Sequence, residues 1–225
     1  MKKKIKAVIF DMDGLMFDTE DLVRRAWDFA GGRLGYEHFG DNIFNTLGKG
    51  DRDRRIYFAD KYGQDFPYDQ FKQDYHNFYY EEIEKKGVPV KPGLYRLLEY
   101  LYENDIPAAV ATSSSRRSAA AKLEETDIEK YFKAVIGGDM VTRTKPDPEI
   151  YLKACEALGV EPEHALVLED SLNGLKAAVA AKIPAIMIPD LVKDMPEIEP
   201  FLAAKLGELG DVIGFIENER RHGQE

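Results

Sequence analysis

The chain has 225 residues and a formal net charge of −10, which argues against general affinity for nucleic acid or for an anionic membrane. No apolar run is long enough to cross a bilayer, and the apolar segment after the basic residues 1–4 is too short for a signal peptide. The single cysteine, Cys155, excludes an intrachain disulfide. We therefore expect a cytoplasmic protein in a reducing compartment.

The first predicted element is a strand over residues 6–10 that ends in two acids. Asp11 and Asp13 follow this strand, and Gly14 comes next. Two carboxylates at one strand end repel each other unless a cation or a shared proton offsets the repulsion. Gly14 allows a backbone conformation that residues with a Cβ avoid. The pattern is typical of a catalytic loop.

The next segment, residues 15–87, is rich in aromatic and charged residues and has no convincing strand pattern. Helical spacing predicts two apolar helix faces, formed by Leu22, Ala26, Phe29 and Ala30 and by Phe71, Tyr75, Phe78 and Tyr79. We interpret the aromatic side chains as a small bundle core rather than a surface for stacking ligands. A helical domain over residues 15–90 is therefore expected, inserted between residues 1–14 and 91–225.

From residue 91 onward, apolar strands alternate with amphipathic helices. Strands are expected over residues 107–111, 134–136, 165–168 and 184–188, and helices from Pro92 and over residues 115–125, 148–158 and 171–181. Residues 217–225 are expected to form a frayed end. Strands that are apolar on both faces indicate a parallel sheet covered on both sides. The predicted fold is α/β, with a doubly wound, Rossmann-like core and an inserted helical domain.

Polar residues follow several of these strands, where ligands bind in an open parallel sheet. Thr112 and Ser113 follow the second strand and open a helix, which suits phosphate oxygens. Glu169 and Asp170 follow the fourth strand, and Lys145 lies in a loop between two strands that contains two prolines. Each residue alone has a simpler explanation as a helix cap or a surface lysine. Together they predict one site at one edge of the sheet.

This set of residues suits phosphoryl transfer. The acids Asp11, Asp13, Glu169 and Asp170 cannot all be ionised together without a cation, and Mg²⁺ with oxygen ligands would resolve that. One carboxylate can then attack phosphorus and form an aspartyl-phosphate, because Mg²⁺ and Lys145 offset the repulsion between anions. A second carboxylate, two residues on, can protonate the leaving oxygen.

Four short motifs resemble, in chain order, those of the haloacid dehalogenase superfamily. They are FDMDG at residues 10–14, ATSS at 111–114, KPDP at 145–148 and LEDS at 168–171. The helical insertion resembles the α-helical cap of that superfamily. The most similar subgroup comprises β-phosphoglucomutase-like and phosphatase members.

The resemblance implies roles for the core residues. Asp11 would be the nucleophile, and Asp13 would be the general acid and then the base that activates water. Thr112 and the backbone N–H of Ser113 would bind phosphoryl oxygens. Lys145 would hold Asp11 and the phosphoryl group.

The resemblance also implies a Mg²⁺ site. Asp11, Asp170 and the main-chain carbonyl of Asp13 would contact the metal, and Glu169 would do so directly or through water. In the cap, Lys49 or Arg52, within residues 48–52, would pair with a distal phosphate or carboxylate of the substrate. The simpler alternative for these two residues is a solvated basic turn.

The identity of residue 23 bears on the reaction. β-Phosphoglucomutases resemble the chain at residues 18–20 but carry a histidine where Val23 aligns, and valine cannot form hydrogen bonds. We therefore expect hydrolysis of a small phosphate monoester, such as a sugar phosphate or a nucleotide, rather than a mutase reaction. The mutase stays an alternative.

Two alternatives come from outside the enzymes. A receiver-like signalling module also places acids, a hydroxyl and a lysine on a doubly wound sheet, but the large insertion and Asp13 argue against it. A sugar-phosphate binding protein would not need Asp11 and Asp13 together. The expected partner is a small phosphorylated metabolite, with neither nucleic acid nor membrane, and the chain would be a monomer or a homodimer.

Overall fold

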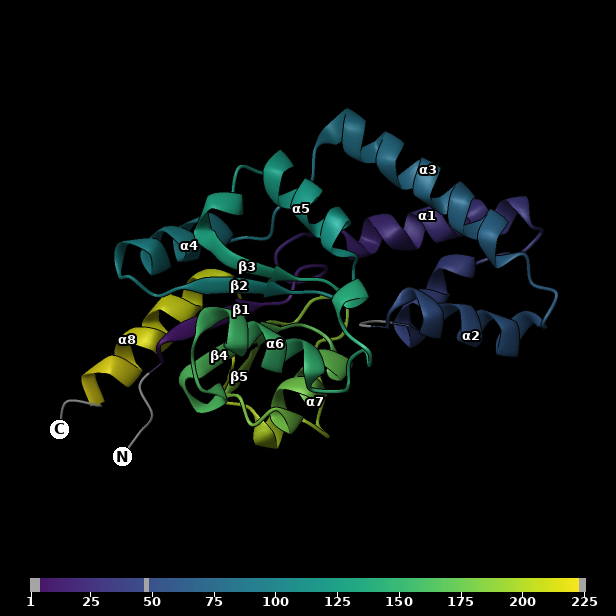
Figure 1. Ribbon diagram of the computed structural model, residues 1–225. Coiled ribbons are helices and arrows are strands. Elements are labelled where there is room, and N and C mark those ends of the chain that lie inside the picture. Colours follow the sequence, from purple (N-terminus) through teal and green to yellow (C-terminus); the bar gives the residue numbers. More distant parts are fainter. Residues whose placement is uncertain (1–4, 47–48, 223–225) are drawn as a thin grey trace.

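The computed structural model describes residues 5–46 and 49–222, so Gly48 of the predicted cap loop lies outside it. Within these residues the core is a six-stranded parallel sheet, and a group of helices extends from one end of it (Figure 1). The strands are β1 (Ala7–Phe10), β2 (Ala108–Ala111), β3 (Phe132–Ile136), β4 (Ala165–Glu169), β5 (Ala185–Met187) and β6 (Ala204–Lys205). Their order in the sheet is β3-β2-β1-β4-β5-β6.

The central position of β1 explains its apolar sequence. Its four residues are all buried, and Ile9 lies opposite Ala109 of β2 on one side and Val167 of β4 on the other. A strand buried on both faces needs a continuous apolar run. The polar residues that follow β1, β2 and β4 therefore meet at one edge of the sheet.

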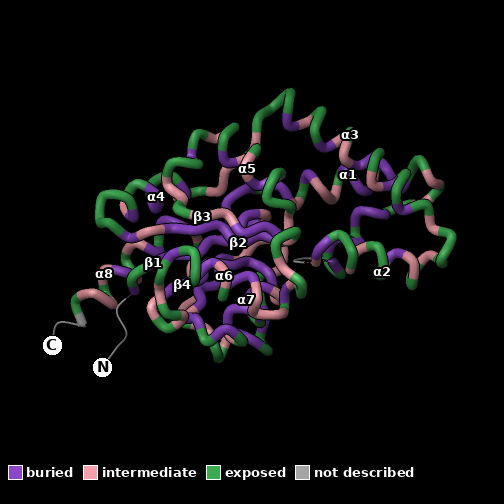
Figure 2. Tube along the Cα trace, in the orientation of Figure 1, coloured by how far each residue is buried: buried purple, intermediate pink, exposed green. Residues whose placement is uncertain are grey.

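Helices cover both faces of the sheet, and Figure 2 shows the strands buried between them. On one face α4 (Leu94–Glu103), α5 (Arg116–Glu125) and α8 (Val212–His222) pack against Phe10 and Val8. On the other face α6 (Glu149–Leu158) and α7 (Leu172–Ala180) pack against Ala7 and Ile9. The predicted doubly wound α/β core is confirmed. No helix of the described residues is long and apolar enough to span a membrane.

The end of the chain differs from the prediction. β6 was not predicted, and residues 217–222 belong to α8 rather than to a frayed end. Val212 and Ile216 of this helix are fully buried against the sheet. Their apolar contacts hold the helix in place, so the expectation of fraying was wrong for these residues. Residues 223–225 lie outside the described part of the chain.

The inserted helices have an aromatic core of their own. They are α1 (Glu20–Arg33), the short 3₁₀ segment η1 (Phe39–Asn45), α2 (Asp51–Tyr62) and α3 (Tyr68–Lys86). Trp27, Phe39, Phe58 and Phe71 are buried, and their ring centroids lie 5.0–5.7 Å apart in the contacting pairs. The expectation for Phe29 was wrong, because this residue is 44% exposed. The buried face of α1 is formed by Leu22, Ala26, Trp27 and Ala30 instead.

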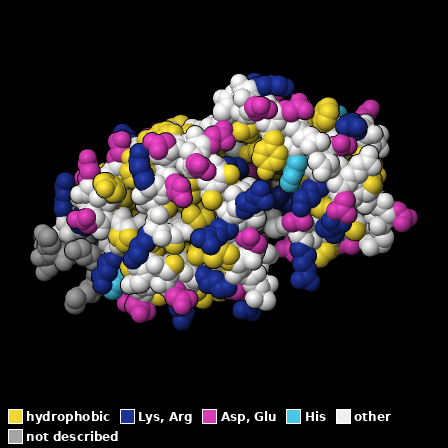
Figure 3. All heavy atoms as spheres, turned by 45° about the horizontal axis from the view of Figure 1, so that its top comes forward, with side chains coloured by type: hydrophobic (Ala, Val, Ile, Leu, Met, Phe, Trp, Pro, Cys, Tyr) yellow, Lys and Arg dark blue, Asp and Glu magenta, His cyan; other side chains and the backbone are white. Residues whose placement is uncertain are grey.

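The chain enters and leaves the helical group at adjacent points. Phe17 and Val90 form an antiparallel β-bridge, and the backbone N–H of Lys91 donates to the carbonyl of Met16 at 2.9 Å. The Lys91 ammonium also pairs with Asp18 at 3.0 Å. Both linkers are thereby tied to each other. Figure 3 shows basic side chains gathered around the boundary between the two lobes on this face.

Candidate active site

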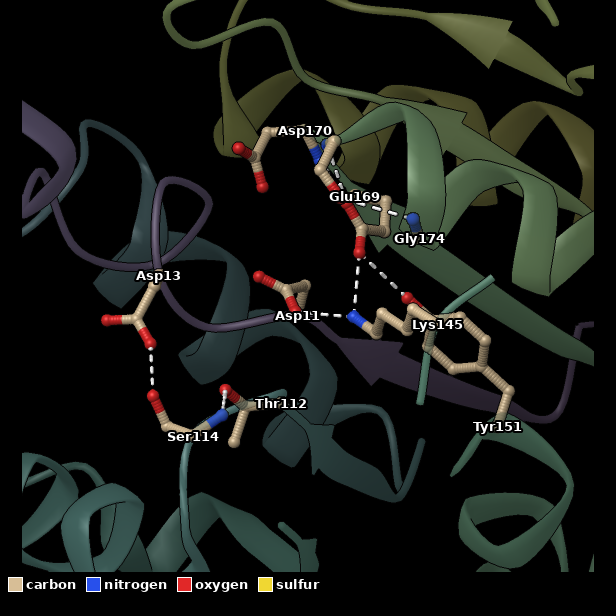
Figure 4. A network of polar contacts seen from close by, with 10 residues as sticks. Asp11, Asp13, Thr112, Ser114, Lys145, Tyr151, Glu169, Asp170 and Gly174 are labelled. Carbon is tan, nitrogen blue, oxygen red and sulfur yellow. Dashed lines mark hydrogen bonds and ion pairs between the residues drawn. The ribbon is translucent and has the colours of Figure 1, made fainter. Parts of the chain in front are cut away.

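The carboxyl ends of three neighbouring strands bring the predicted residues together (Figure 4). Asp11 and Asp13 follow β1, Thr112 follows β2, and Glu169 and Asp170 end and follow β4. Asp11, Thr112, Glu169 and Asp170 are buried, and Asp13 is partly exposed. The structure thus places these side chains in one site, as the strand-end argument expects.

Lys145 joins two of the acids. Its ammonium donates to Asp11 Oδ1 at 2.6 Å and to Glu169 Oε1 at 2.7 Å, and the residue is only 3% exposed. Burial works against its charge, but attraction to Asp11 and Glu169 outweighs burial and raises the pKa of Lys145. The ammonium also lies 4.9 Å from the centre of the Tyr151 ring. A permanently charged lysine thus sits beside the predicted nucleophile.

Three carboxylates form a cluster that fits a divalent cation. Ligand oxygens of Asp11, Glu169 and Asp170 lie within 4.8 Å of one another. Burial raises the pKa of Asp11 to about 7 against the opposing effect of Lys145, and burial followed by repulsion from Glu169 raises that of Asp170. Asp170 Oδ1 is buried and has no hydrogen-bond partner among the described residues. Hard oxygen ligands with excess negative charge and a free oxygen suit Mg²⁺.

Glu169 is held by donors of the protein on both oxygens. Oε1 accepts from Lys145 and, at 3.0 Å, from the Tyr151 hydroxyl. Oε2 accepts from the backbone N–H groups of Asp170 and Ser171 at 2.8 and 2.7 Å. Asp170 has the free oxygen that Glu169 lacks, so these contacts favour indirect contact of Glu169 with a metal.

Two glycines make room for these acids. A Cβ on Gly174 would lie 1.5 Å from Glu169 Oε1, and one on Gly14 would lie 2.4 Å from Asp170 Oδ2. Gly14 also has a φ of +87°, in the region that disfavours other residues. The close approach of carboxylate and backbone therefore depends on glycine at both positions.

Asp13 occupies a different environment from Asp11. Its Oδ2 accepts from the Ser114 hydroxyl at 2.8 Å, and its Oδ1 accepts from the Thr19 hydroxyl at 3.1 Å and from the Lys122 ammonium. Burial acts to raise the pKa of Asp13, but the Lys122 charge and the hydrogen bonds outweigh it and lower the pKa. In Figure 4 its carboxylate points toward Ser114 and away from Lys145. The two aspartates thus differ in their hydrogen-bond partners and in the direction in which their pKa values are shifted.

Lys122 was not predicted from the sequence. It lies on α5, within the predicted helix, and contacts Asp13, 109 residues earlier in the chain. Its spacing of four from Ser118, which lines the same cavity, puts both on one face of the helix. A lysine in an alanine-rich helix segment was the only sequence signal.

The hydroxyl loop after β2 is positioned as expected. The backbone N–H of Thr112 donates to Ile136 of β3 at 3.0 Å, and its Oγ1 accepts from the N–H of Ser114 at 3.1 Å. Ser115 caps α5 by accepting from Ser118 N–H at 3.2 Å. This local bonding holds Thr112 at the edge of the sheet, while Ser113 lines the cavity in front of it.

A cavity of about 300 Å³ opens between the sheet edge and the inserted helices. Its walls include Asp13, Val23, Lys49 and other residues from the sheet edge and the inserted helices. Among the lining residues that were not predicted are Glu20, Trp27, Arg54, Lys72, Tyr75, His76, Tyr79, Tyr80 and Lys122. Arg52 lines a separate hollow with Thr144 and Pro146. Of the two predicted cap residues, Lys49 lines the cavity and Arg52 lies outside it.

The comparison with known proteins agrees with this geometry. The model of the haloacid dehalogenase-like hydrolase family matches residues 8–188, from β1 through β5. The chain belongs to the haloacid dehalogenase-like hydrolase family. The predicted family and the expectation of a phosphatase-type hydrolase are confirmed at this level.

Several members of the family resemble most of the chain. A phosphorylated carbohydrates phosphatase from Thermotoga maritima is 36% identical over 187 residues, which is 81% of this chain and 84% of the relative. The crystal structure of CbbY from Rhodobacter sphaeroides in complex with phosphate superposes with a TM-score of 0.78, at 28% identity, covering 92% of this chain and 96% of that one. A β-phosphoglucomutase from Clostridium difficile, at 21% identity and a TM-score of 0.79, covers 97% and 98% and shares the fold.

Proposed function

We propose that the protein is a Mg²⁺-dependent phosphatase that hydrolyses a small phosphate monoester through an aspartyl-phosphate on Asp11. The observation that carries this proposal is that Asp11 and Asp13, at the end of one strand, have different neighbouring side chains. Asp11 lies beside Lys145 and the acidic cluster, while Asp13 lies beside Lys122, Thr19 and Ser114 on the cavity wall. These surroundings support Asp11 as the nucleophile and Asp13 as the residue that transfers protons.

The first half-reaction transfers the phosphoryl group to the protein. Asp13 first takes up a proton from solvent. An oxygen of Asp11 then attacks phosphorus, the bond from phosphorus to the ester oxygen breaks, and Asp13 gives that proton to the ester oxygen. Lys145 neutralises the approach of the two anions, and Thr112 with the Ser113 N–H would bind phosphoryl oxygens. The leaving alcohol occupies the cavity between the sheet edge and the inserted helices.

The second half-reaction restores the protein. Asp13, now a carboxylate, takes a proton from a water as the water attacks phosphorus, and the bond between phosphorus and Asp11 breaks. Free phosphate leaves, and Asp13 has regained its proton. Asp11, Asp170 and the main-chain carbonyl of Asp13 would hold Mg²⁺, and Glu169 would contact it indirectly. When bound, Mg²⁺ supplies positive charge that offsets the charge of the phosphoryl group.

We assign residues 1–14 and 91–225 to the catalytic core and residues 15–90 to a cap. The separate aromatic cluster of the inserted helices supports this division, as do the linkers joined at Phe17 and Val90. The cap covers the cavity and would exclude water from the first half-reaction. Cap and core meet again where the Thr144 hydroxyl donates to Asp53 at 2.8 Å.

The cavity supports hydrolysis rather than a mutase reaction. Val23 lines the cavity near Asp13 and offers no hydrogen bond. A mutase must release its bisphosphate intermediate and rebind it, whereas a phosphatase needs only water after the alcohol leaves. Conversion of glucose 1-phosphate to glucose 6-phosphate, primed by glucose 1,6-bisphosphate, should be absent, and rapid conversion would favour the mutase.

The charges of the cavity support a phosphorylated carbohydrate as substrate. Glu20 lies near Asp13, and burial raises its pKa to about 8, so it can exchange hydrogen bonds with sugar hydroxyls. Lys49, Arg54 and Lys72 line the cap side, and burial together with Lys72 lowers the pKa of His76 there. Lys72 pairs with Asp51 at 2.8 Å, so Lys49 and Arg54 are the cations of this side that suit a second anionic group on the substrate. The phosphatase from Thermotoga maritima, named for phosphorylated carbohydrates, is consistent with that class.

Phosphate release from a panel of phosphorylated sugars, nucleotides and small acids tests the proposal, with Mg²⁺ and with EDTA. We expect the wild type to release phosphate with Mg²⁺ and not with EDTA. Asp11→Asn should release none, because it keeps the size of the side chain but removes the nucleophile. Release from no ester would refute the phosphatase. A stable phosphorylated protein without turnover would instead support a receiver-like module.

Two further properties belong to the proposal. The buried thiol of Cys155 agrees with a reducing, cytoplasmic location. A monomer or a homodimer is expected, and size-exclusion chromatography with light scattering distinguishes them.

A further inference from the structure

Lys122 belongs to the catalytic core, and it lines the cavity. The reaction described above gives it no role. Its side chain is 13% exposed and lies on α5, on the sheet side of the cavity. Removing an ammonium from water is costly unless a partner offsets the loss. The partner here is Asp13, the residue that transfers protons in the proposed reaction.

Three donors from three segments fix the direction of the Asp13 carboxylate. Thr19 comes from the first linker to the cap, Ser114 from the loop after β2, and Lys122 from α5. Among these donors only Lys122 carries a charge, and charged hydrogen bonds are the stronger ones. Lys122 is therefore the main restraint on Asp13.

Lys122 also touches the cap. Its ammonium lies 5.5 Å from the centre of the Tyr79 ring on α3 and 6.0 Å from that of Phe17 in the first linker. Tyr79 belongs to the buried aromatic cluster of the cap. An ammonium over an aromatic face is attracted to it. Lys122 thus contacts the proton-transferring residue and the cap at once.

We propose that Lys122 is a positioning residue that orients Asp13 for proton transfer, and that it does so when α3 of the cap is docked against it through Tyr79. The inference rests on the proposed function of Asp13. The proton moves from Asp13 to the leaving oxygen and later from water to Asp13, while Lys122 keeps its own protons throughout. Orientation of Asp13 would then be coupled to closure of the cap.

The choice of ester separates this role from a general structural one. An alkyl phosphate such as glucose 6-phosphate needs its leaving oxygen protonated, whereas p-nitrophenyl phosphate releases a stable phenolate. For Lys122→Met we expect kcat on the alkyl ester to fall by about 10²-fold. The rapid burst of p-nitrophenol, which reports attack by Asp11, should stay within about threefold of the wild type, because it needs no proton from Asp13.

Two companion variants complete the comparison. Lys122→Arg keeps a charged donor and should recover part of the loss on the alkyl ester. Lys130→Met, at an exposed lysine paired with Asp127, is the matched control and should behave as the wild type. Circular dichroism checks that each variant is folded, and Lys122→Arg remains informative if Lys122→Met is not.

The coupling to the cap is tested by Tyr79→Leu. We expect about a tenfold loss on the alkyl ester, and little further loss when this change is added to Lys122→Met, because both remove the same restraint. Equal losses on both esters, an unchanged alkyl rate, or additive effects of the two changes would overturn the inference. The alkyl ester used is the one that the wild type hydrolyses fastest in the panel, and a wild type that hydrolyses no ester of the panel would refute the proposed function instead.

Discussion

Glycine at position 174 is predicted to be essential because of a carboxylate, not because of the helix it belongs to. A Cβ at this position would lie 1.5 Å from Glu169 Oε1 and 2.0 Å from its Cδ. Glu169 cannot retreat without breaking contacts, since Lys145 and Tyr151 hold Oε1 and two backbone N–H groups hold Oε2. Gly174→Ala should therefore displace the Glu169 side chain.

The magnitude follows from the contacts that are lost. Hydrogen bonds to a charged group contribute about 1.5–3 kcal/mol each, so losing two of the four costs about 3–6 kcal/mol. Alanine is a better helix former than glycine by about 1 kcal/mol, which offsets part of that cost. The expected net loss in the free energy of unfolding is about 2–5 kcal/mol.

Urea unfolding in EDTA measures this loss, and Gly214→Ala provides the control. Gly214 lies within α8, and no described atom lies within 4 Å of its added Cβ, so this variant should be more stable by up to about 1 kcal/mol. Glu169→Ala should cost less when added to Gly174→Ala than when made alone, because two of the four contacts are already gone. A Gly174→Ala protein as stable and as active as the wild type would refute the reasoning.

Three other predictions concern charge, metal and cap. The native state raises the pKa of Glu20 from 4.5 to about 8, so it keeps a proton that the unfolded chain releases, and its contribution to stability falls as pH rises between these values. Urea unfolding at several pH values should show that Glu20→Gln removes this fall; a wild type with the same pH dependence as the variant would contradict it. Mg²⁺ should raise the melting temperature of the wild type but not of Asp170→Asn, because ligands that bind only the native state stabilise it; equal shifts in both would exclude Asp170 as a ligand. Phe58→Ala removes a fully buried ring and should cost about 3–5 kcal/mol in urea unfolding, and a cost below about 1 kcal/mol would mean that the cap core repacks.

Much of the core could be predicted because its physical signals are local. β1, β2 and β4 are short apolar runs, and the polar residues after them are adjacent in sequence to the strands that position them. The edge of a parallel sheet then brings these residues together without further information. This is why the sequence alone predicts Asp11, Thr112 and Asp170 in one site.

The remaining features depend on contacts between distant residues. The two-residue strand β6 is too short to show a period. Residues 217–222, expected to fray, belong to a helix that Val212 and Ile216 anchor to the core. Lys122 and Tyr151 reach the site from helices rather than from strand ends. Arg52 and Arg54 are two residues apart, yet only Arg54 lines the cavity. Which side chain of a basic segment faces the substrate is decided by how the cap packs.

The adjacent linkers have a consequence for how this protein could diversify. The bridge between Phe17 and Val90 holds the two points where the chain leaves and re-enters the core side by side. For the core, the cap is therefore connected in the same way as a surface loop. The entropic cost of closing a loop grows only slowly with its length, so the intervening helices can change size and composition without disturbing the register of the sheet. New specificities can arise by replacement of this module, while the sheet edge that carries Asp11 stays the same.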